Sequence, residues 1–217
     1  MAGRAALISQ MDPPPGEERE FDAWYSEEHV PLRMDVPGFL SAVRGYAVQG
    51  APSHLVVYYL DSPEVLATEE YRDVKNNPSA RTAHMLKNVG AFTRYTGDEI
   101  SDTGAADPGR YLYLVTFDVP EDFQAEFDAW YERDHLPYLM SNKAWLRCRR
   151  YSIVDSDPAG VTRAAVHELA DLSALDSPER ERARTTPWRS RLSRNDWFSS
   201  ARYAVYEQFQ VFDATWS

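Results

Sequence analysis

The chain has 217 residues and a mass of 24.8 kDa, enough for one large domain or two small ones. Hydrophobic residues make up 43% and charged residues 26% of the chain, which excludes disordered, collagen-like and coiled-coil compositions. The formal charge of -11 excludes the basic footprint that binding to nucleic acid or to an anionic membrane requires.

Cysteine content and hydropathy argue against a disulfide-rich, secreted or membrane-spanning protein. The single cysteine, Cys148, excludes an intramolecular disulfide framework and a cysteine-built metal site, and it fits a reducing compartment. The N-terminal apolar run from Ala5 to Ile8 is too short for a secretory signal, and no window reaches a membrane-spanning length. We therefore expect a cytoplasmic protein with no nucleic-acid partner and no membrane partner.

Apolar periodicity and turn residues predict the same order of elements in each half of the chain: strand, helix, strand, strand, helix, strand. In the first half these elements span residues 4–11, 17–29, 39–48, 54–60, 63–88 and 90–99. In the second half they span residues 110–119, 122–135, 145–154, 163–169, 173–196 and 200–212. This order is that of a ferredoxin-like βαββαβ unit, so we predict one unit over residues 1–100, a linker over 101–109 and a second unit over 110–217.

The first predicted helix of each half carries a repeated sequence. The segment FDAWYSEEHVPLRM at residues 21–34 recurs as FDAWYERDHLPYLM at residues 127–140, an offset of 106, with eight of fourteen positions identical. Flanking apolar runs keep the same offset, which indicates a tandem duplication. Each unit leaves one face of its sheet bare, so we expect the two sheets to pack face to face within the chain.

The repeated pattern of Phe, Asp, two aromatic residues, an acidic residue with His, a hydrophobic residue and Pro resembles the helix signature of EthD-like proteins. These proteins are part of the dimeric α+β barrel superfamily, and the resemblance covers both halves of the chain. It implies an α+β fold in which two tandem ferredoxin-like units form an intrachain, pseudo-dimeric barrel. That superfamily includes cofactor-free cyclases, lactone isomerases, decarboxylases and dehydratases, as well as haem-binding branches.

Two histidines are the candidate catalytic residues. His29 and His135 each end an aromatic stripe on the predicted helix, and imidazole titrates near neutral pH, which suits a general acid or base. Tyr25 and Tyr131, one turn earlier, are candidates to hydrogen-bond the same substrate oxygen or to orient the imidazole ring. The alternative interpretation is that each histidine caps the C-terminus of its helix.

The candidate substrate-binding residues come from the second half. Arginines fall on both faces of the predicted strand 145–154, and a buried arginine needs an anion, which is either a protein carboxylate or a substrate acid. Aromatic residues near His135 would stack a planar ring, and loop residues 30–38 and 136–144 would shape the pocket. His167 has no counterpart in the first half; it is either part of a specialised site or a satisfied core residue. The candidates are Arg147, Arg149, Trp145, Tyr138, Tyr151 and His167.

Two further sets of charged residues bear on the site. Asp22 and Asp128 lie two helical turns before their histidines, too far for direct pairing, and we assign them a structural role. The arginines that cluster among acidic residues, at 147, 149, 150, 182, 184, 189, 191 and 194, form either a local anion site or solvated helix faces.

We interpret the chain as an enzyme that works without a cofactor or metal, and the resemblance to EthD-like proteins implies a small aromatic, polyketide-like or lactone substrate; the arginines make an acidic substrate a further expectation. The reaction would be that of a lyase or decarboxylase, a cyclase or an isomerase, with histidine moving the proton. One alternative is a haem-binding enzyme of the same fold with His135, His29 or His167 as axial ligand. Another is a non-catalytic protein that binds a hydrophobic small molecule. Whether two fused barrels pair as a homodimer stays open.

Overall fold

The computed structural model describes residues 4–104 and 109–216 and contains the predicted elements in both halves. The first half comprises β1 (Ala5–Asp12), α1 (Glu18–Trp24), α2 (Val30–Met34), β2 (Phe39–Gln49), β3 (His54–Leu60), α3 (Glu69–Asn76), α4 (Ala80–Asn88) and β4 (Gly90–Gly104). The second half comprises β5 (Tyr111–Phe117), α5 (Glu121–Trp130), α6 (Leu136–Met140), β6 (Trp145–Asp157), β7 (Arg163–Leu169), α7 (Pro178–Thr185), α8 (Pro187–Leu192) and β8 (Arg202–Asp213). The predicted order of strands and helices is confirmed.

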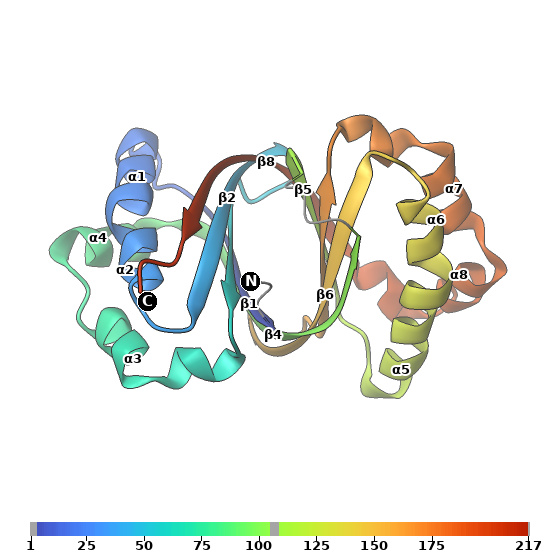
Figure 1. Cartoon of the computed structure of the whole chain (residues 1–217), viewed down its shortest axis with the longest axis horizontal. Coiled ribbons are helices and arrows are strands. Elements are labelled where there is room, and N and C mark those ends of the chain that lie inside the picture. The colour runs from blue at the N-terminus through green and yellow to red at the C-terminus, as the bar shows by residue number, and fades with distance from the viewer. Residues whose placement is uncertain (1–3, 105–108, 217) are drawn as a thin grey trace.

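The strands close into one antiparallel barrel in the order β1-β3-β2-β8-β5-β7-β6-β4. Each half contributes four adjacent strands, β4-β1-β3-β2 and β8-β5-β7-β6, which is the strand order of a ferredoxin-like sheet. The barrel lies in the middle of the molecule, and the helices of each half cover the outside of their own sheet (Figure 1). The predicted pairing of two sheets within one chain is therefore confirmed, as a closed α+β barrel.

Two long strands join the halves. β4 pairs with β1 through residues up to Asp98 and with β6 through residues Arg94 to Gly104. β8 likewise pairs with β5 and, through residues up to Asp213, with β2. The expected linker 101–109 is corrected here, because residues 101–104 form the end of β4; residues 105–108 lie outside the described part of the chain. Closure leaves no unpaired sheet edge between the halves, which stabilises the barrel.

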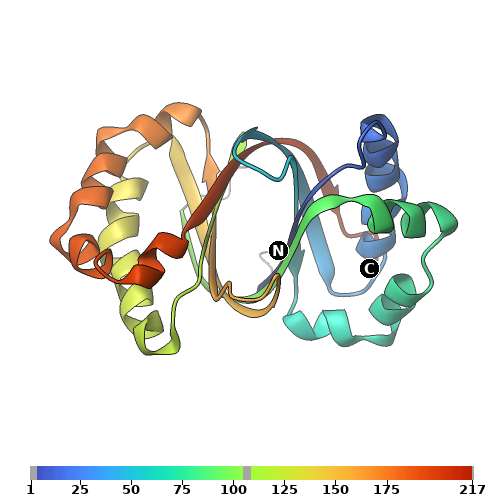
Figure 2. The ribbon, with the colours of Figure 1, turned by 180° about the vertical axis from the view of Figure 1, so that it is seen from behind.

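Alternate residues of each strand face the barrel interior and the helices. On β5, Leu112 and Leu114 belong to the interior core, whereas Tyr113 and Val115 pack under the helices of the second half. β1 alternates in the same way between its interior and helix-facing residues. Both faces of these strands are buried, which explains their nearly continuous apolar sequences. Figure 2 shows the same two helical layers on either side of the barrel from behind.

The first helix of each half continues past the point where the sequence predicts its end. A π-helical turn, Tyr25–His29 or Tyr131–His135, follows α1 or α5 and leads directly into α2 or α6. Pro31 and Pro137 are therefore inside the helical run, at the second position of α2 and α6. The wider π turn accommodates a proline that would otherwise break an α-helix. Consequently neither histidine caps a C-terminus, and residues 30–34 and 136–140 are helix rather than loop.

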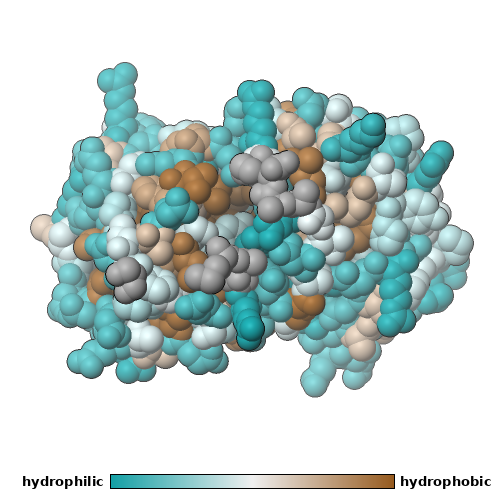
Figure 3. All heavy atoms as spheres, in the orientation of Figure 1, coloured by the Kyte–Doolittle hydropathy of each residue, from teal (hydrophilic) through white to brown (hydrophobic). Residues whose placement is uncertain are grey.

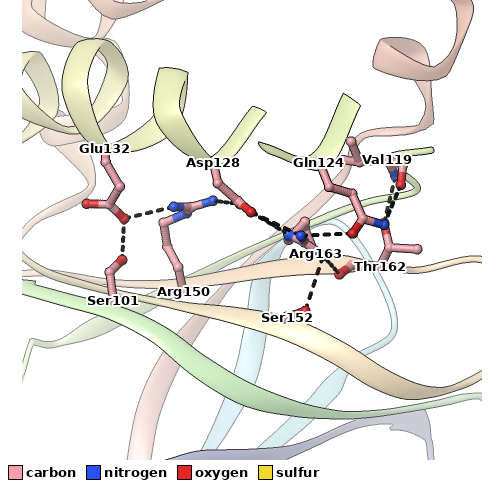
Figure 4. A network of polar contacts seen from close by, with 9 residues as sticks. All are labelled: Ser101, Val119, Gln124, Asp128, Glu132, Arg150, Ser152, Thr162 and Arg163. Atoms are coloured by element: carbon pink, nitrogen blue, oxygen red, sulfur yellow. Dashed lines mark hydrogen bonds and ion pairs between the residues drawn. The ribbon is translucent and has the colours of Figure 1, made fainter. Parts of the chain in front are cut away.

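Buried ion pairs attach the first helix to the sheet at the same place in both halves. Arg150 is 2% exposed and pairs with Asp128 and with Glu132, whose Oε1 lies 2.8 Å away (Figure 4). Arg163 also binds Asp128, at 3.0 Å. In the first half, Arg44 pairs with Asp22 at 3.0 Å. The structural role predicted for these aspartates is confirmed, and the buried arginines pair with the protein's own acids.

The outer surface in Figure 3 is mostly hydrophilic, as expected for a chain with 26% charged residues. Hydrophilic side chains dominate the periphery of the face in Figure 3, and hydrophobic side chains gather in smaller patches toward its middle. Across residues 4–104 and 109–216, no helix combines the length and the apolar character needed to cross a lipid bilayer.

Candidate functional site

A cavity of about 330 Å³ lies between the sheet and the helices of the second half. Its floor comes from side chains of β5, β6 and β7 that point away from the barrel interior, and its walls come from the helical segments 130–139 and 180–199. The lining residues are Tyr113, Val115, Phe117, Trp130, Tyr131, His135, Leu139, Trp145, His167, Arg180, Arg184, Arg189, Phe198, Ser199, Ala201 and Tyr203. Aromatic rings, two imidazoles and three guanidinium groups thus share one space.

A β-bulge decides which residues of β6 reach this cavity. The register between β6 and β7 shifts between Trp145 and Arg147. Residues two positions apart on a regular strand share a face, but this shift places Trp145 and Arg147 on opposite faces. Trp145 packs in the helix-facing core, whereas Tyr151 belongs to the barrel interior. The bulge therefore sends Trp145 to the cavity and turns Arg147, Arg149 and Tyr151 away from it.

His167 holds the centre of a hydrogen-bond chain. Nε1 of Trp145 lies 3.0 Å from Nδ1 of His167, and Nε2 of His167 lies 2.9 Å from the hydroxyl of Tyr131. An indole nitrogen only donates, so Nδ1 of His167 is the acceptor and carries no proton. Burial lowers the pKa of His167 well below 6.5, which keeps the ring neutral with its one proton on Nε2. Nε2 therefore donates to Tyr131.

Tyr131 receives this hydrogen bond and keeps its own proton. Its side chain is 2% exposed, and burial raises its pKa well above 10, so the phenol stays protonated. Because its oxygen already accepts from His167, its hydroxyl proton remains available as a donor. The guanidinium carbon of Arg150 lies 4.4 Å from the centre of the Tyr131 ring and holds the ring in place.

His135 presents the opposite chemistry to the same cavity. Its Nδ1 lies 3.3 Å from the backbone carbonyl oxygen of Ala183, which only accepts, so Nδ1 carries the proton. Nε2 is then the unprotonated nitrogen of a ring that lines the cavity. Burial, the main cause, lowers the pKa of His135 to about 3, and the positive charges of Arg189, Arg180 and Arg150 also contribute. The cavity therefore contains one protonated hydroxyl donor and one neutral imidazole acceptor.

Three arginines on α7 and α8 line the outer side of the cavity. The sequence singles out Arg184 and Arg189 within a wider arginine cluster, but it misses Arg180. The available signal is spacing, because Arg180 and Arg184 lie four residues apart on one face of α7.

Four of the predicted substrate-binding residues lie elsewhere. Arg147 donates to both carboxylate oxygens of Asp102, at 2.7 and 2.5 Å. The guanidinium of Arg149 lies 4.2 Å from the ring centre of Tyr59, a residue of the barrel interior. Tyr151 is fully buried in that interior, and Tyr138 is 39% exposed on α6. Of the predicted substrate-binding set, only Trp145 and His167 line the cavity.

The first half places different residues at the equivalent positions. Tyr25 and His29 are 3% and 5% exposed, and their ring centres lie 4.8 Å apart. Tyr58 pairs with Leu7 on β1, whereas His167 pairs with Tyr113 on β5, so Tyr58 stands where the second half has His167. Phe39, at the start of β2, stands where the second half has Trp145. The indole–imidazole–phenol chain is therefore built in the second half.

Comparison with known proteins supports the fold alone. No protein-family model and no curated protein sequence matches the chain. Among solved structures, an anthrone oxidase-like protein superimposes with a TM-score of 0.71 at 11% identity, over 98% of this chain and 94% of that one. A monooxygenase-like protein from Fusobacterium nucleatum subsp. nucleatum gives 0.62 at 10% identity, over 98% and 96% of the two chains.

A third similar structure is a mutant chlorite dismutase from Candidatus Nitrospira defluvii in complex with cyanide. It gives a TM-score of 0.60 at 9% identity, over 95% of this chain and 90% of that one. All three span almost the full length of this chain, including both halves and the closed sheet. The chain therefore shares the α+β barrel fold of these structures, closed here within one polypeptide.

Proposed function

We propose that the chain is an enzyme whose working site is the cavity of the second half, acting on a small aromatic, polyketide-like or lactone substrate by proton transfer. One observation carries this proposal: Tyr131 and His135 line the same cavity as a hydroxyl donor and an unprotonated imidazole acceptor. A donor beside an acceptor is the arrangement that forms and stabilises an enolate or phenolate. The reaction needs no cofactor in this mechanism and would be a decarboxylation or other lyase step, a cyclisation or an isomerisation.

The roles follow from the protonation states. The hydroxyl of Tyr131 donates to the carbonyl or phenol oxygen on which negative charge develops, and His167 and Trp145 aim it. Nε2 of His135 takes the proton from the neighbouring carbon or oxygen and returns it later. A negative charge formed beside the imidazolium offsets part of the desolvation that lowers the pKa of His135. The aromatic walls stack the planar ring and exclude water.

The same proposal includes an EthD-like, tandemly duplicated origin of the chain. Three observations support it. Both copies of the repeated sequence form a helix with a π-helical turn in the same place. Both contain, at their second position, an aspartate bound to an arginine of the following strand, Asp22 to Arg44 and Asp128 to Arg150, at the common offset of 106 residues. Both deliver their histidine to the helix-facing side of the sheet.

The similar structures suggest a second reaction for the enolate or phenolate formed in the cavity, which is oxidation by dioxygen. An anthrone oxidase-like protein and a monooxygenase-like protein share the fold. An electron-rich enolate or phenolate made in the cavity is also the species that reacts with dioxygen, so the substrate assay is run both in air and without oxygen. Product that forms only in air assigns the oxygenase fate, and product that forms in both assigns proton-transfer chemistry alone.

A haem-binding enzyme is the second candidate, and the geometry of His135 favours it. Its Nδ1 donates to a backbone carbonyl and its ring lines the cavity with Nε2 unprotonated, and a hydrogen bond from the other nitrogen is how proteins orient an imidazole toward a metal. His167 does not fit this role because both of its nitrogens are engaged. Bound haem would supply redox chemistry at iron. The volume of about 330 Å³ lies at the low end for ligand cavities and favours one small ring system over a macrocycle.

The deciding experiment follows product masses for a panel of phenolic acids, β-keto acids and lactones. Wild type is compared with Tyr131→Phe and His135→Gln, and with Tyr25→Phe and His29→Gln from the first half. We expect turnover to fall by about 100-fold or more in the second-half variants. Loss only in the first-half variants would contradict the proposed site. Ligand-induced stabilisation without product from any compound would instead identify a binding protein, and a visible absorption band on adding haem, lost in His135→Ala, would identify the haem alternative.

A further inference from the structure

Three arginines line the cavity without a carboxylate partner. Among the described residues, no Asp or Glu oxygen lies within 4.0 Å of the guanidinium groups of Arg180, Arg184 or Arg189. These three are distinguished from the other arginines without such a partner by lining one cavity together. Arg147, Arg150, Arg163 and Arg191 each have such a partner.

Three of the acidic residues near these helices are bound to other groups. Asp134 accepts from the hydroxyl of Thr186, and Glu179 accepts from the amide of Asn142 at 2.9 Å. Glu126 pairs with Arg191 at 2.6 Å. The positive charge at the cavity is therefore not neutralised by these neighbours.

Two of the three guanidinium groups are held in place by the protein. Nη1 of Arg180 donates to the carbonyl of Leu175 at 2.5 Å, and its Cζ lies 5.9 Å from the ring centre of Tyr113. Nη1 of Arg189 donates to the carbonyl of Arg184 at 2.9 Å, and its Cζ lies 5.3 Å from the ring centre of Phe198. Each such bond uses one of five N–H donors, so the remaining donors are free for a ligand. Both aromatic rings also line the cavity.

Repulsion among the three guanidinium groups also favours binding of an anion between them. Burial lowers the pKa of Arg189, and the charges of Arg184 and Arg180 lower it further, whereas the carboxylate of Glu181 on α7 acts in the opposite direction. Bringing like charges together around a half-buried cavity costs free energy, and an anion bound between them offsets that cost.

We propose that Arg180, Arg184 and Arg189 form an anion subsite that binds the carboxylate of a planar aromatic acid, whose ring lies in the cavity toward Tyr131 and His135. The inference deepens the proposed function and rests on it for the reacting end of the ligand, whereas the arginines carry the anionic end. A carboxylate matches the planar, bidentate donor geometry of guanidinium. The cavity volume of about 330 Å³ suits an acid with one or two fused rings.

The test measures binding of two matched probes, 3-hydroxy-2-naphthoate and its neutral amide, by titration calorimetry. The probes share shape and hydroxyl group and differ in the charged group. We expect the acid to bind at least tenfold more tightly than the amide, and this difference to shrink as salt is raised. The variants Arg180→Gln, Arg184→Gln and Arg189→Gln should each weaken binding of the acid by about tenfold and leave binding of the amide nearly unchanged.

Arg191→Gln is the matched control, because Arg191 is on α8 but pairs with Glu126 outside the cavity. Equal affinity for acid and amide, failure of both probes to bind, or equal losses in Arg191→Gln and the cavity variants would each overturn the anion subsite. Turnover of an aromatic acid that is lost in Tyr131→Phe but is unaffected by the three arginine variants would overturn the subsite while leaving the proposed function intact. Arginine-dependent binding of the acid, with no turnover of any aromatic acid, would support the subsite and count against the proposed function.

Discussion

The indole Nε1 of Trp145 lies 3.0 Å from Nδ1 of His167, and this contact sets the protonation state of the cavity. It assigns the only proton of the neutral imidazole to Nε2, which passes the hydrogen bond on to the hydroxyl of Tyr131. The outcome is a tyrosine whose own proton is free for a ligand.

The Trp145–His167 bond contributes to stability as well as to orientation. Trp145→Phe leaves Nδ1 of a fully buried His167 without a donor, whereas Trp130→Phe removes an equal volume from a buried indole whose Nε1 has no hydrogen-bond partner among the described residues. We expect Trp145→Phe to lower the free energy of unfolding by about 1–3 kcal/mol more than Trp130→Phe. Urea denaturation measures both, and equal losses would show that the bond adds nothing.

Acid should destabilise the protein through its buried histidines. Burial lowers the pKa of His135 to about 3 and the pKa values of His29 and His167 well below 6.5, so the unfolded chain binds more protons below pH 6.5 than the folded chain. Stability is therefore complete above about pH 6.5 and falls as the pH drops toward 3, by up to about 1.4 kcal/mol per pH unit for each histidine. Denaturation at pH 7, 6 and 5 measures the slope.

The variant His135→Gln isolates one histidine in that slope. It should make stability between pH 7 and 5 less dependent on pH than in wild type, since one proton-binding group is lost from the unfolded state. An unchanged or steeper slope would mean that His135 is protonated as readily in the folded protein as in the unfolded chain.

The two halves should differ in their response to removal of the tyrosine hydroxyl. Tyr131→Phe removes the donor that faces the cavity, and we expect kcat to fall by about 100-fold or more with little change in the fold. Tyr25→Phe alters the equivalent position, where Tyr58 stands in place of His167. Steady-state kinetics with the substrate found in the mass screen measures kcat for both variants. A larger loss of kcat in Tyr25→Phe than in Tyr131→Phe would place the working site in the first half.

The ion pairs that attach the helices to the sheet should contribute unequally to the free energy of unfolding in the two halves. Asp128→Asn leaves two arginines, Arg150 and Arg163, without their shared carboxylate, and both are buried (Figure 4). We expect a loss of about 3–5 kcal/mol in the free energy of unfolding. Asp22→Asn removes one partner from one arginine, Arg44, and should cost less. Thermal or urea denaturation compares them, and a greater loss in Asp22→Asn would contradict this ranking.

Much of the fold was predictable because its signals are local. Period-two alternation, apolar runs and turn residues predict strands in the correct order, and β1 and β5 begin and end close to the expected residues. The helix ends were not predictable, since Pro31 and Pro137 read as breakers. The π-helical turn that accommodates each proline depends on packing against the sheet and leaves no separate mark in the sequence.

The candidate site was predictable only in part. Tyr131, His135, Trp145 and His167 are expected from sequence and meet in one cavity, because helix periodicity brings the first two to the sheet. Arg147, Arg149 and Tyr151 were expected beside them, but the bulge after Trp145 reverses the faces of β6. Bulges change the alternation by one residue, and a single sequence gives no reason to place one there.

The sequence by itself determined the order of elements, the burial of the strands on both faces and the helix that carries each histidine, since these depend on residue spacing within short segments. Only the tertiary structure decided how the halves join through β4 and β8, and that Trp145, His167 and Tyr131 form one hydrogen-bond chain. It also decided that Arg180, Arg184 and Arg189 face a cavity rather than solvent alone. These relationships join residues far apart along the chain, and their geometry is set by side-chain packing and barrel closure rather than by local pattern.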